Sequence, residues 1–220
     1  MYKCGRLIVW VFCAVLCCGG FGRARADDAC VETAKNMKLV TLSYNYGILA
    51  FDHSKTRAQV KKICQQSHAA GCFIHSFGSR QLTAARQAVK VGNTYCLMPH
   101  ITVNYDFSGA TVYVSKELDA CPSRAVLRHE LQHFTIWKKA TEEMLRELGV
   151  KLKKLALNDV KECGSSKRCS SSIIEKADNL TTAITKKWED YSNKNNGRLD
   201  EVDHDLNVEF AYRACESWPY

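Results

Sequence analysis

The sequence predicts one α+β domain, in which a small antiparallel sheet with a strand hairpin packs on a central helix, followed by a long helical hairpin and a C-terminal helix. β-branched and aromatic residues gather in the first half of the chain, apolar residues recur every three or four positions in the second half, and no repeat or linker divides the 220 residues. With 46% hydrophobic residues, 12 Gly and 3 Pro, the composition excludes a disordered or collagen-like chain.

The first 26 residues have the pattern of a secretory signal peptide. Lys3 and Arg6 give a positive start, an apolar stretch follows, and residues 24–26 (Ala-Arg-Ala) form a small-x-small cleavage site. The apolar stretch is shorter than the roughly 20 residues that a membrane helix needs. We therefore expect a secreted or periplasmic protein without a stable membrane span, whose single domain covers residues 27–220.

Eight cysteines follow the predicted cleavage site, and their even number indicates an oxidising compartment and as many as four disulfides. The sequence does not determine how they pair, although Cys64 with Cys72 and Cys163 with Cys169 are the short-range pairs that we expect. No CxxC pair occurs after the signal peptide, which argues against a zinc site made of cysteines.

The first half of the mature chain predicts strands around one helix. Residues 40–51 and 73–77 are rich in β-branched and aromatic residues, as strands are. Residues 55–67 follow good capping residues and predict a helix, whereas residues 81–89 fit either a short helix or the approach to a strand.

The middle of the chain predicts a strand hairpin and then the central helix. Residues 96–107 and 110–115 are the clearest strands, and Ser108-Gly109 between them suits a turn. Ser123 is a suitable N-cap for the helix that begins immediately afterwards.

The second half predicts helices only. Apolar residues keep helical spacing as far as Leu155 and again from Ile173 to Tyr191, which predicts a helical hairpin with a disulfide-closed tip. Residues 193–197 form a polar break, and residues 200–218 resemble one last helix.

The central helix carries an HExxH motif at residues 129–133. His129 and His133 lie one helical turn apart, so both imidazoles can reach one zinc ion while Glu130 leans over the open side of the metal. Two core or surface histidines with an incidental glutamate would give the same pattern. The position of the motif on a predicted helix, after a hairpin and in a secreted chain, favours a metal site.

Through this motif the chain resembles the zincin metallopeptidases. The resemblance implies that the two histidines bind zinc, that the glutamate is the general base, and that an edge strand before the helix, here residues 111–115, holds the extended substrate. The metzincin subgroup is excluded, because Ile136 and Lys139 stand where it needs Gly and His. Glu142 and Glu143 are poor third ligands, since they lie about 14 Å further along the same helix.

The third zinc ligand is expected in the acidic cluster of residues 200–205. The mature chain also resembles a bacterial family of predicted secreted zinc-dependent proteases of unknown function, in which an acidic segment ending in His follows the HExxH helix. The chain departs from that pattern at two positions, because Val202 and Asp205 stand where the family tends to have Thr and Gly. We expect His204 as the ligand because imidazole is the commoner neutral ligand. The alternatives are Glu201, Asp203 and Asp205, and an acidic helix N-terminus would also explain the cluster.

The remaining histidines have no ligand spacing, and we interpret them as surface or capping residues: His53, His68, His75 and His100. Zincins often stabilise the oxyanion with a His, Tyr or Arg, and on this resemblance His100, Tyr212 and Arg213 are candidates for that role.

We therefore expect a secreted or periplasmic zinc-dependent peptidase, with Zn²⁺ as cofactor, a protein or peptide as substrate, a zinc-activated water and Glu130 as general base. Nucleic acid is not an expected partner, because the mature chain would carry only 27 Lys and Arg against 23 Asp and Glu. Two alternatives stay open. One is a disulfide-stapled envelope protein with a binding or structural role and a non-catalytic HExxH, and the other is a zinc amidase acting on cell-wall peptides.

Overall fold

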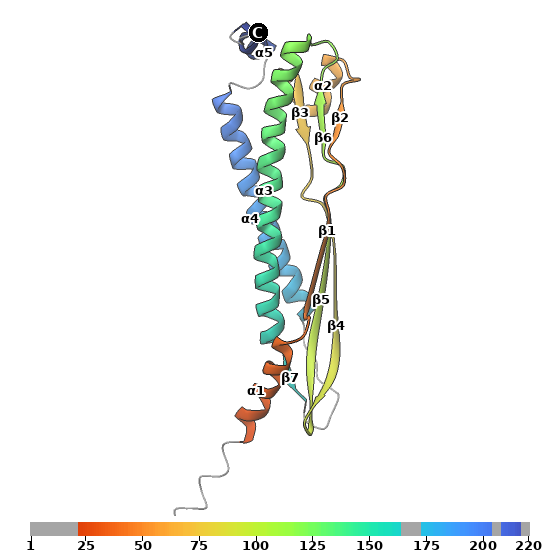
Figure 1. The fold of residues 1–220 in the computed structure, drawn as a ribbon, viewed down its shortest axis with the longest axis vertical. Helices are drawn as coiled ribbons and strands as arrows, with labels where there is room; N and C mark the ends of the chain where they lie inside the picture. The colour runs from red at the N-terminus through yellow and green to blue at the C-terminus, as the bar shows by residue number, and fades with distance from the viewer. Residues whose placement is uncertain (1–21, 164–172, 204–207, 217–220) are drawn as a thin grey trace, which may run out of the picture.

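The computed structural model describes residues 22–163, 173–203 and 208–216, and these form an elongated rod (Figure 1). The longest helix, α3, has 39 residues and therefore extends for about 58 Å. The elements in chain order are α1 (Gly22–Lys35), β1 (Val40–Asn45), β2 (Ala50–Asp52), α2 (Arg57–Cys64), β3 (Gly71–Ile74), β4 (Ser79–Val91), β5 (Thr94–Asp106), β6 (Thr111–Val114), α3 (Ala120–Asn158), β7 (Lys161–Glu162), α4 (Ile173–Val202) and α5 (Val208–Glu216).

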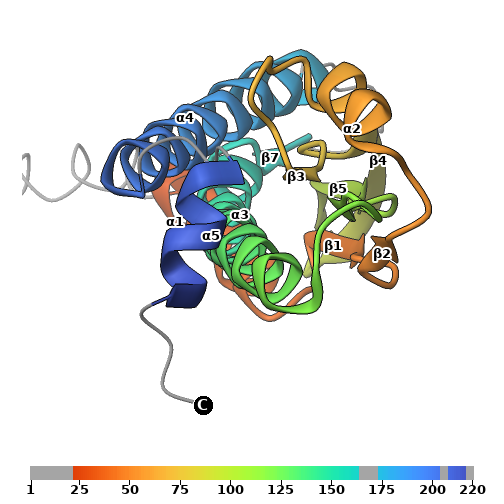
Figure 2. The ribbon, with the colours of Figure 1, turned by 90° about the horizontal axis from the view of Figure 1, so that it is seen from above.

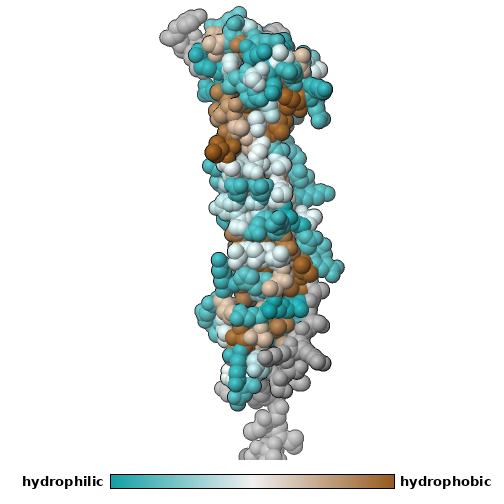
Figure 3. Space-filling view, turned by 90° about the vertical axis from the view of Figure 1, so that its right-hand side faces the viewer, coloured by the Kyte–Doolittle hydropathy of each residue, from teal (hydrophilic) through white to brown (hydrophobic). Residues whose placement is uncertain are grey.

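The rod has a helical side and a strand side. Helices α3 and α4 run alongside each other, and the strands lie beside α3 (Figures 1 and 2). The α+β class, the long helical hairpin and the C-terminal helix that the sequence predicted are thus confirmed. Seen from the strand side, the surface is mostly hydrophilic, with small hydrophobic groups just below the end that carries α5 and again in the lower half of the rod (Figure 3).

Two separate sheets make up the strand side. The larger has the order β1-β5-β4, with β7 also paired to β5, and the smaller has the order β2-β6-β3. Strands β4 and β5 form a 13-residue antiparallel hairpin closed by a Gly92-Asn93 turn, while β1 pairs with β5 and β2 with β6 in parallel. The sheets are therefore mixed, where the sequence predicted antiparallel pairing only.

The predicted hairpin between residues 96–107 and 110–115 is wrong. The turn at Ser108-Gly109, with Gly109 at a φ of 93°, carries the chain from β5 in the large sheet to β6 in the small one. Strand β5 instead pairs along its whole length with β4, which follows from the ambiguous residues 81–89 being a strand. Pairing with β4 gives β5 thirteen cross-strand residue pairs across a two-residue turn, whereas β6 has only four residues to pair. The β4–β5 hairpin is therefore the more stable arrangement.

The central helix begins three residues before the expected Ser123 cap and continues as one helix through the leucine-rich stretch. One face of α3 forms the core against the large sheet, and its fully buried members recur at three- and four-residue spacing: Trp137, Ala140, Met144, Leu148 and Leu152. Helix α4 buries Ile173, Ala177 and Ile184 in the same core.

Residues 193–197 do not break the second helix, as the sequence analysis expected, because α4 continues through them to Val202. A glycine inside a helix costs only about 1 kcal/mol. Tertiary contacts offset this cost here, since Ser192 is fully buried and Asn196 hydrogen bonds to α3.

Between residues that the structure describes there are three disulfides, and each joins two different secondary-structure elements or their ends. The predicted Cys64–Cys72 bond joins α2 to β3 and is confirmed. The other two join α1 to β5 (Cys30–Cys96) and the start of α3 to α5 (Cys121–Cys215). Cys169, the expected partner of Cys163, lies outside the described residues. Across the described ranges, no helix is both long enough and apolar enough to cross a membrane.

Gly71 fixes how closely β3 approaches α3. A Cβ at this position would lie 2.4 Å from Val126 Cγ1 and 2.7 Å from the Tyr113 carbonyl oxygen. We expect Gly71→Ala to lower the free energy of unfolding by about 1–3 kcal/mol through overpacking, as measured by urea denaturation. Gly197→Ala is the matched control, because nothing lies within 4 Å of its Cβ position and alanine is the better helix former. Equal stability of the two variants would contradict this account of the contact.

Candidate metal centre

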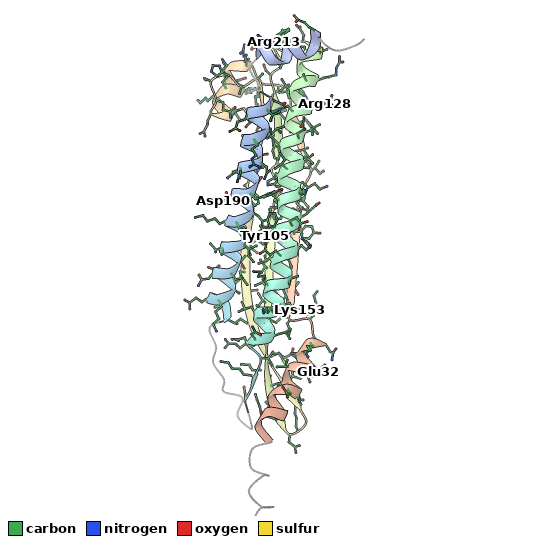
Figure 4. All side chains as sticks on the ribbon, turned by 90° about the vertical axis from the view of Figure 1, so that its left-hand side faces the viewer. Glu32, Tyr105, Arg128, Lys153, Asp190 and Arg213 are labelled. Carbon is green, nitrogen blue, oxygen red and sulfur yellow. A yellow bond between two sulfur atoms is a disulfide. The ribbon has the colours of Figure 1, made fainter. Side chains whose placement is uncertain are left out.

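The three motif residues lie in the third and fourth turns of α3, near the α5 end of the rod. Arg128, the residue before the motif, marks this position in Figure 4. His129 and Glu130 are each 3% exposed and His133 is 9% exposed. The Nε2 atoms of His129 and His133 lie 2.8 Å apart, as expected for two histidines at i and i+4 on one helix face. The motif is therefore buried in the interior and its two imidazoles converge.

Helix α4 supplies the partners of both imidazoles. Asp200 Oδ1 lies 2.9 Å from His133 Nε2 and 3.3 Å from His129 Nε2. The outer nitrogens are engaged as well, because Asp203 Oδ2 lies 2.7 Å from His129 Nδ1 and Asn196 Oδ1 lies 3.1 Å from His133 Nδ1. Every ring nitrogen of the two histidines thus faces an oxygen of α4 or of Asp203, the residue that follows it.

The donor set fits a divalent metal. Ligand atoms of His129, His133 and Asp200 all lie within 4.8 Å of one another. Two imidazole nitrogens and one carboxylate are the three protein ligands that leave one position open on a catalytic zinc. Asp203 and Asn196 would hold the two rings from behind, which is the usual task of the groups around metal-bound histidines.

The charges in this cluster depend on one another. Burial alone would lower the pKa of His129 and His133, but hydrogen bonds to carboxylates, with Asp200 common to both, raise it above the usual value. Burial alone would raise the pKa of Asp200, but its hydrogen bonds with the two histidines hold that pKa far below its usual range. The side chains therefore form a charge-paired network between α3 and α4.

Glu130 lies beside this network but is not one of the three converging ligands. Burial raises its pKa to about 7, although the two histidines and the backbone N–H of Phe73, which donates to the carboxylate, oppose the shift. A carboxyl group with a pKa near neutrality can both accept and return a proton at physiological pH.

A cavity of about 150 Å³ opens over the cluster. Its walls come from the motif, from Asn196 and Asp200 on α4, and from residues Gln66, Gly71, Cys72, Phe73 and His75 around β3. The strand beside the site is therefore β3 and not residues 111–115, which were expected to hold the substrate. Residues 111–114 form β6, the central strand of the small sheet, whereas among the described strands β3 pairs with β6 alone and lies at the edge.

His75 is a further polar group in this cavity. Burial, with a smaller contribution from His133, lowers the pKa of His75 to about 4, so its ring is neutral at pH 7. The ring stacks on Phe73 at 5.0 Å and packs on Trp137 at 5.6 Å. Its Nδ1 atom is buried without a hydrogen-bond partner among the described residues. His75 is therefore a fixed, neutral imidazole and not the surface residue that the sequence suggested.

The other predicted site residues have different positions. His204, the expected third ligand, and Asp205 lie outside the described residues. Glu201 is exposed, and Asp203 binds the outer nitrogen of His129. The oxyanion candidates are not among the lining residues: His100 Nδ1 faces the Lys38 carbonyl oxygen, Tyr212 donates to Asp119, and Arg213 is on α5.

Sequence reasoning missed Asp200 as a candidate ligand and Asn196 as its neighbour, because a helix break was expected between residues 193 and 197. The signal was present in their spacing: Asn196, Asp200 and Asp203 occupy positions i, i+4 and i+7 and share one helix face.

Comparison with known proteins adds no relative. No family model, no curated protein and no solved structure matches this chain.

We expect Asp200→Ala to weaken zinc binding by at least about 100-fold, because loss of even an outer partner costs about 10–100-fold. The measurement is competition with a chromophoric chelator, and Asp190→Ala, on the same helix but outside the cluster, is the control. His204→Ala should be measured in parallel. If it loses zinc while Asp200→Ala keeps it, the assignment of Asp200 is wrong.

His75 should make the metal-free protein acid-sensitive. Its pKa is about 4 when folded and about 6.5 when unfolded, so the unfolded state binds the proton more tightly. This contribution to stability is complete above pH 6.5 and is lost as the pH falls towards 4. Between pH 7 and pH 4 the wild type should lose about 3 kcal/mol more unfolding free energy than His75→Phe. Urea titrations in chelator measure this, and the exposed His68→Phe should behave as wild type.

Proposed function

We propose that this protein is a zinc-dependent peptidase that works in a secreted or periplasmic setting. The observation that carries the proposal is the convergence of His129, His133 and Asp200 in one cavity beside the buried carboxyl of Glu130. When bound there, zinc supplies a Lewis acid that lowers the pKa of water to about 7. Asp203 and Asn196 orient the two imidazoles for this task.

Glu130 has the environment of a general base. Its carboxylate accepts a proton from the attacking water and later gives it to the amine that leaves. Proton transfer of this kind is most effective when the pKa of the group lies near the working pH, and burial brings the pKa of Glu130 to about 7. The Phe73 N–H holds the carboxylate at the cavity wall.

His75 has the properties of a hydrogen-bond donor to the substrate. A neutral imidazole carries one N–H, and the ring of Phe73, stacked on it, and the ring of Trp137, tilted against it, fix its orientation at the cavity. A donor fixed in this way stabilises the negative oxygen that forms when water adds to a carbonyl group. We assign this role to His75 in place of His100, Tyr212 and Arg213.

A peptide is the substrate that best fits the cavity wall. Strand β3 has β6 on one side only, and Gly71, Cys72 and Phe73 line the cavity. The unpaired groups of an edge strand can bind an extended peptide by main-chain hydrogen bonds. The three disulfides support an oxidising compartment, in agreement with the predicted signal peptide.

Glu130→Gln separates catalysis from metal binding. The amide keeps the shape of the side chain but cannot accept the proton, so we expect kcat to fall by about 100-fold or more. Zinc content, measured by elemental analysis, should stay at the wild-type level, because Glu130 is not a ligand. Hydrolysis is followed with a library of quenched fluorescent peptides.

The control is Glu142→Gln, an exposed glutamate on the same helix that should leave both values unchanged. Full activity of Glu130→Gln would refute the role of the base. If the zinc-loaded wild type cleaves no peptide in the library, the proposed peptidase activity fails and a binding role in the envelope becomes the better account.

A further inference from the structure

A second cavity of about 480 Å³ lies further along the rod, between α4 and the strands of the large sheet. In Figure 4, Tyr105 and Asp190 mark its level, well below the motif. The residues that line it are Phe77, Gly78, Arg80, Tyr105, Thr182, Thr185, Lys186, Glu189 and Asp190. None of them belongs to the candidate metal centre.

One row of side chains on α4 serves both cavities. Asp178, Thr182, Thr185, Glu189, Asn196 and Asp200 follow one another at spacings of three, four or seven residues, so they lie on a single helix face. At one end of the row, Asp178 and Thr182 bind Arg80 and Thr185 hydrogen bonds to Tyr105. At the other end, Asn196 and Asp200 bind the motif histidines. The row therefore extends from the metal centre to the second cavity.

The opposite wall is also shared. Gly71, Cys72, Phe73 and His75 line the first cavity. Two residues after His75 the same segment reaches the second cavity, which Phe77, Gly78 and Arg80 line. This segment connects β3 of the small sheet with β4 of the large one. The two cavities thus lie between the same stretch of chain and the same helix face.

The separation of the cavities corresponds to a few residues of extended polypeptide. Along α4, Glu189 lies 11 residues and Thr185 lies 15 residues before Asp200. At a rise of about 1.5 Å per residue these intervals are roughly 16 and 22 Å. An extended chain rises about 3.3 Å per residue, so it covers them in about five to seven residues.

The lining of the second cavity suits a polypeptide of mixed composition. Its floor contains the aromatic rings of Phe77 and Tyr105, which are 7% and 3% exposed. Its rim carries both positive and negative side chains, Arg80 and Lys186 against Glu189 and Asp190, together with threonine hydroxyls. A cavity of this size and mixture fits apolar side chains with polar groups around them, whereas a polyanion would meet two carboxylates.

We propose that the second cavity is a remote binding site for the substrate polypeptide, which holds residues about five to seven positions from the bond that is cleaved at the metal centre. This rests on the proposed peptidase function and extends it. The substrate is a long extended polypeptide, and not a short cell-wall peptide. Binding energy from such a distant site increases kcat/KM only for substrates that reach it.

The first test uses peptides of four to ten residues built around one cleaved sequence and lengthened on either side of the bond. One series of peptides is lengthened on the N-terminal side of the bond and the other on the C-terminal side. In one of them, kcat/KM should rise by about tenfold once the added residues reach the second cavity. Glu189→Trp fills the cavity from its rim and should remove most of this gain. Lys194→Trp, exposed on the same helix but off the shared row, should keep it. No gain with length, or equal behaviour of the two tryptophan variants, would overturn the proposal.

The second test does not need turnover. Zinc-loaded Glu130→Gln protein is titrated into fluorescein-labelled unfolded casein, and binding is followed by anisotropy. The double variant that also carries Glu189→Trp should bind casein about fivefold or more weakly. The double variant that carries Lys194→Trp instead should bind it with unchanged affinity. If casein binds with the same affinity to both double variants, or does not bind at all, the remote site is refuted. Peptidase failure alone, with cavity-dependent binding intact, would refute only the proposed catalysis.

Discussion

The packing of α4 against α3 is the contact on which the candidate site depends. The histidines come from one helix and their oxygen partners from the other, some 70 residues later in the chain, so neither helix could assemble the cluster alone. Buried histidines and the half-buried Asp200 carboxylate would each be costly in isolation, because charged groups without partners lose their hydration. Their mutual hydrogen bonds remove this cost and also fix the register of the two helices.

The small sheet completes the site from the other side. Gly71 allows β3 to lie against α3, and the Phe73 N–H is thereby brought to the Glu130 carboxylate. The Cys64–Cys72 disulfide holds the same strand to α2. The position of the Glu130 carboxylate therefore depends on the backbone N–H of Phe73. A side-chain substitution at Phe73 would keep this N–H.

The sequence predicted correctly those features that depend on interactions between residues close together in the chain. The HExxH spacing placed two imidazoles on one helix face, and the apolar periodicity identified the helical pair, because both depend only on residues a turn or two apart. Strand pairing depends on distant partners, so the ambiguity of residues 81–89 concealed the longest strand pair and made a false hairpin attractive. The polar residues 193–197 looked like a break because their helical partners, including His133, lie about 60 positions earlier. The same error hid Asp200 as a candidate ligand.

The rod separates the two ends of the described chain. Helix α1 lies at the end opposite α5, and from His133 to the end of α3 the helix alone extends for roughly 40 Å (Figure 1). A tag, a surface linkage or a lipid attached ahead of α1 would therefore hold the cavity well away from its point of attachment. The proposed peptidase would then not reach polypeptides held close to the attachment surface. It would reach those that project some tens of ångströms from that surface.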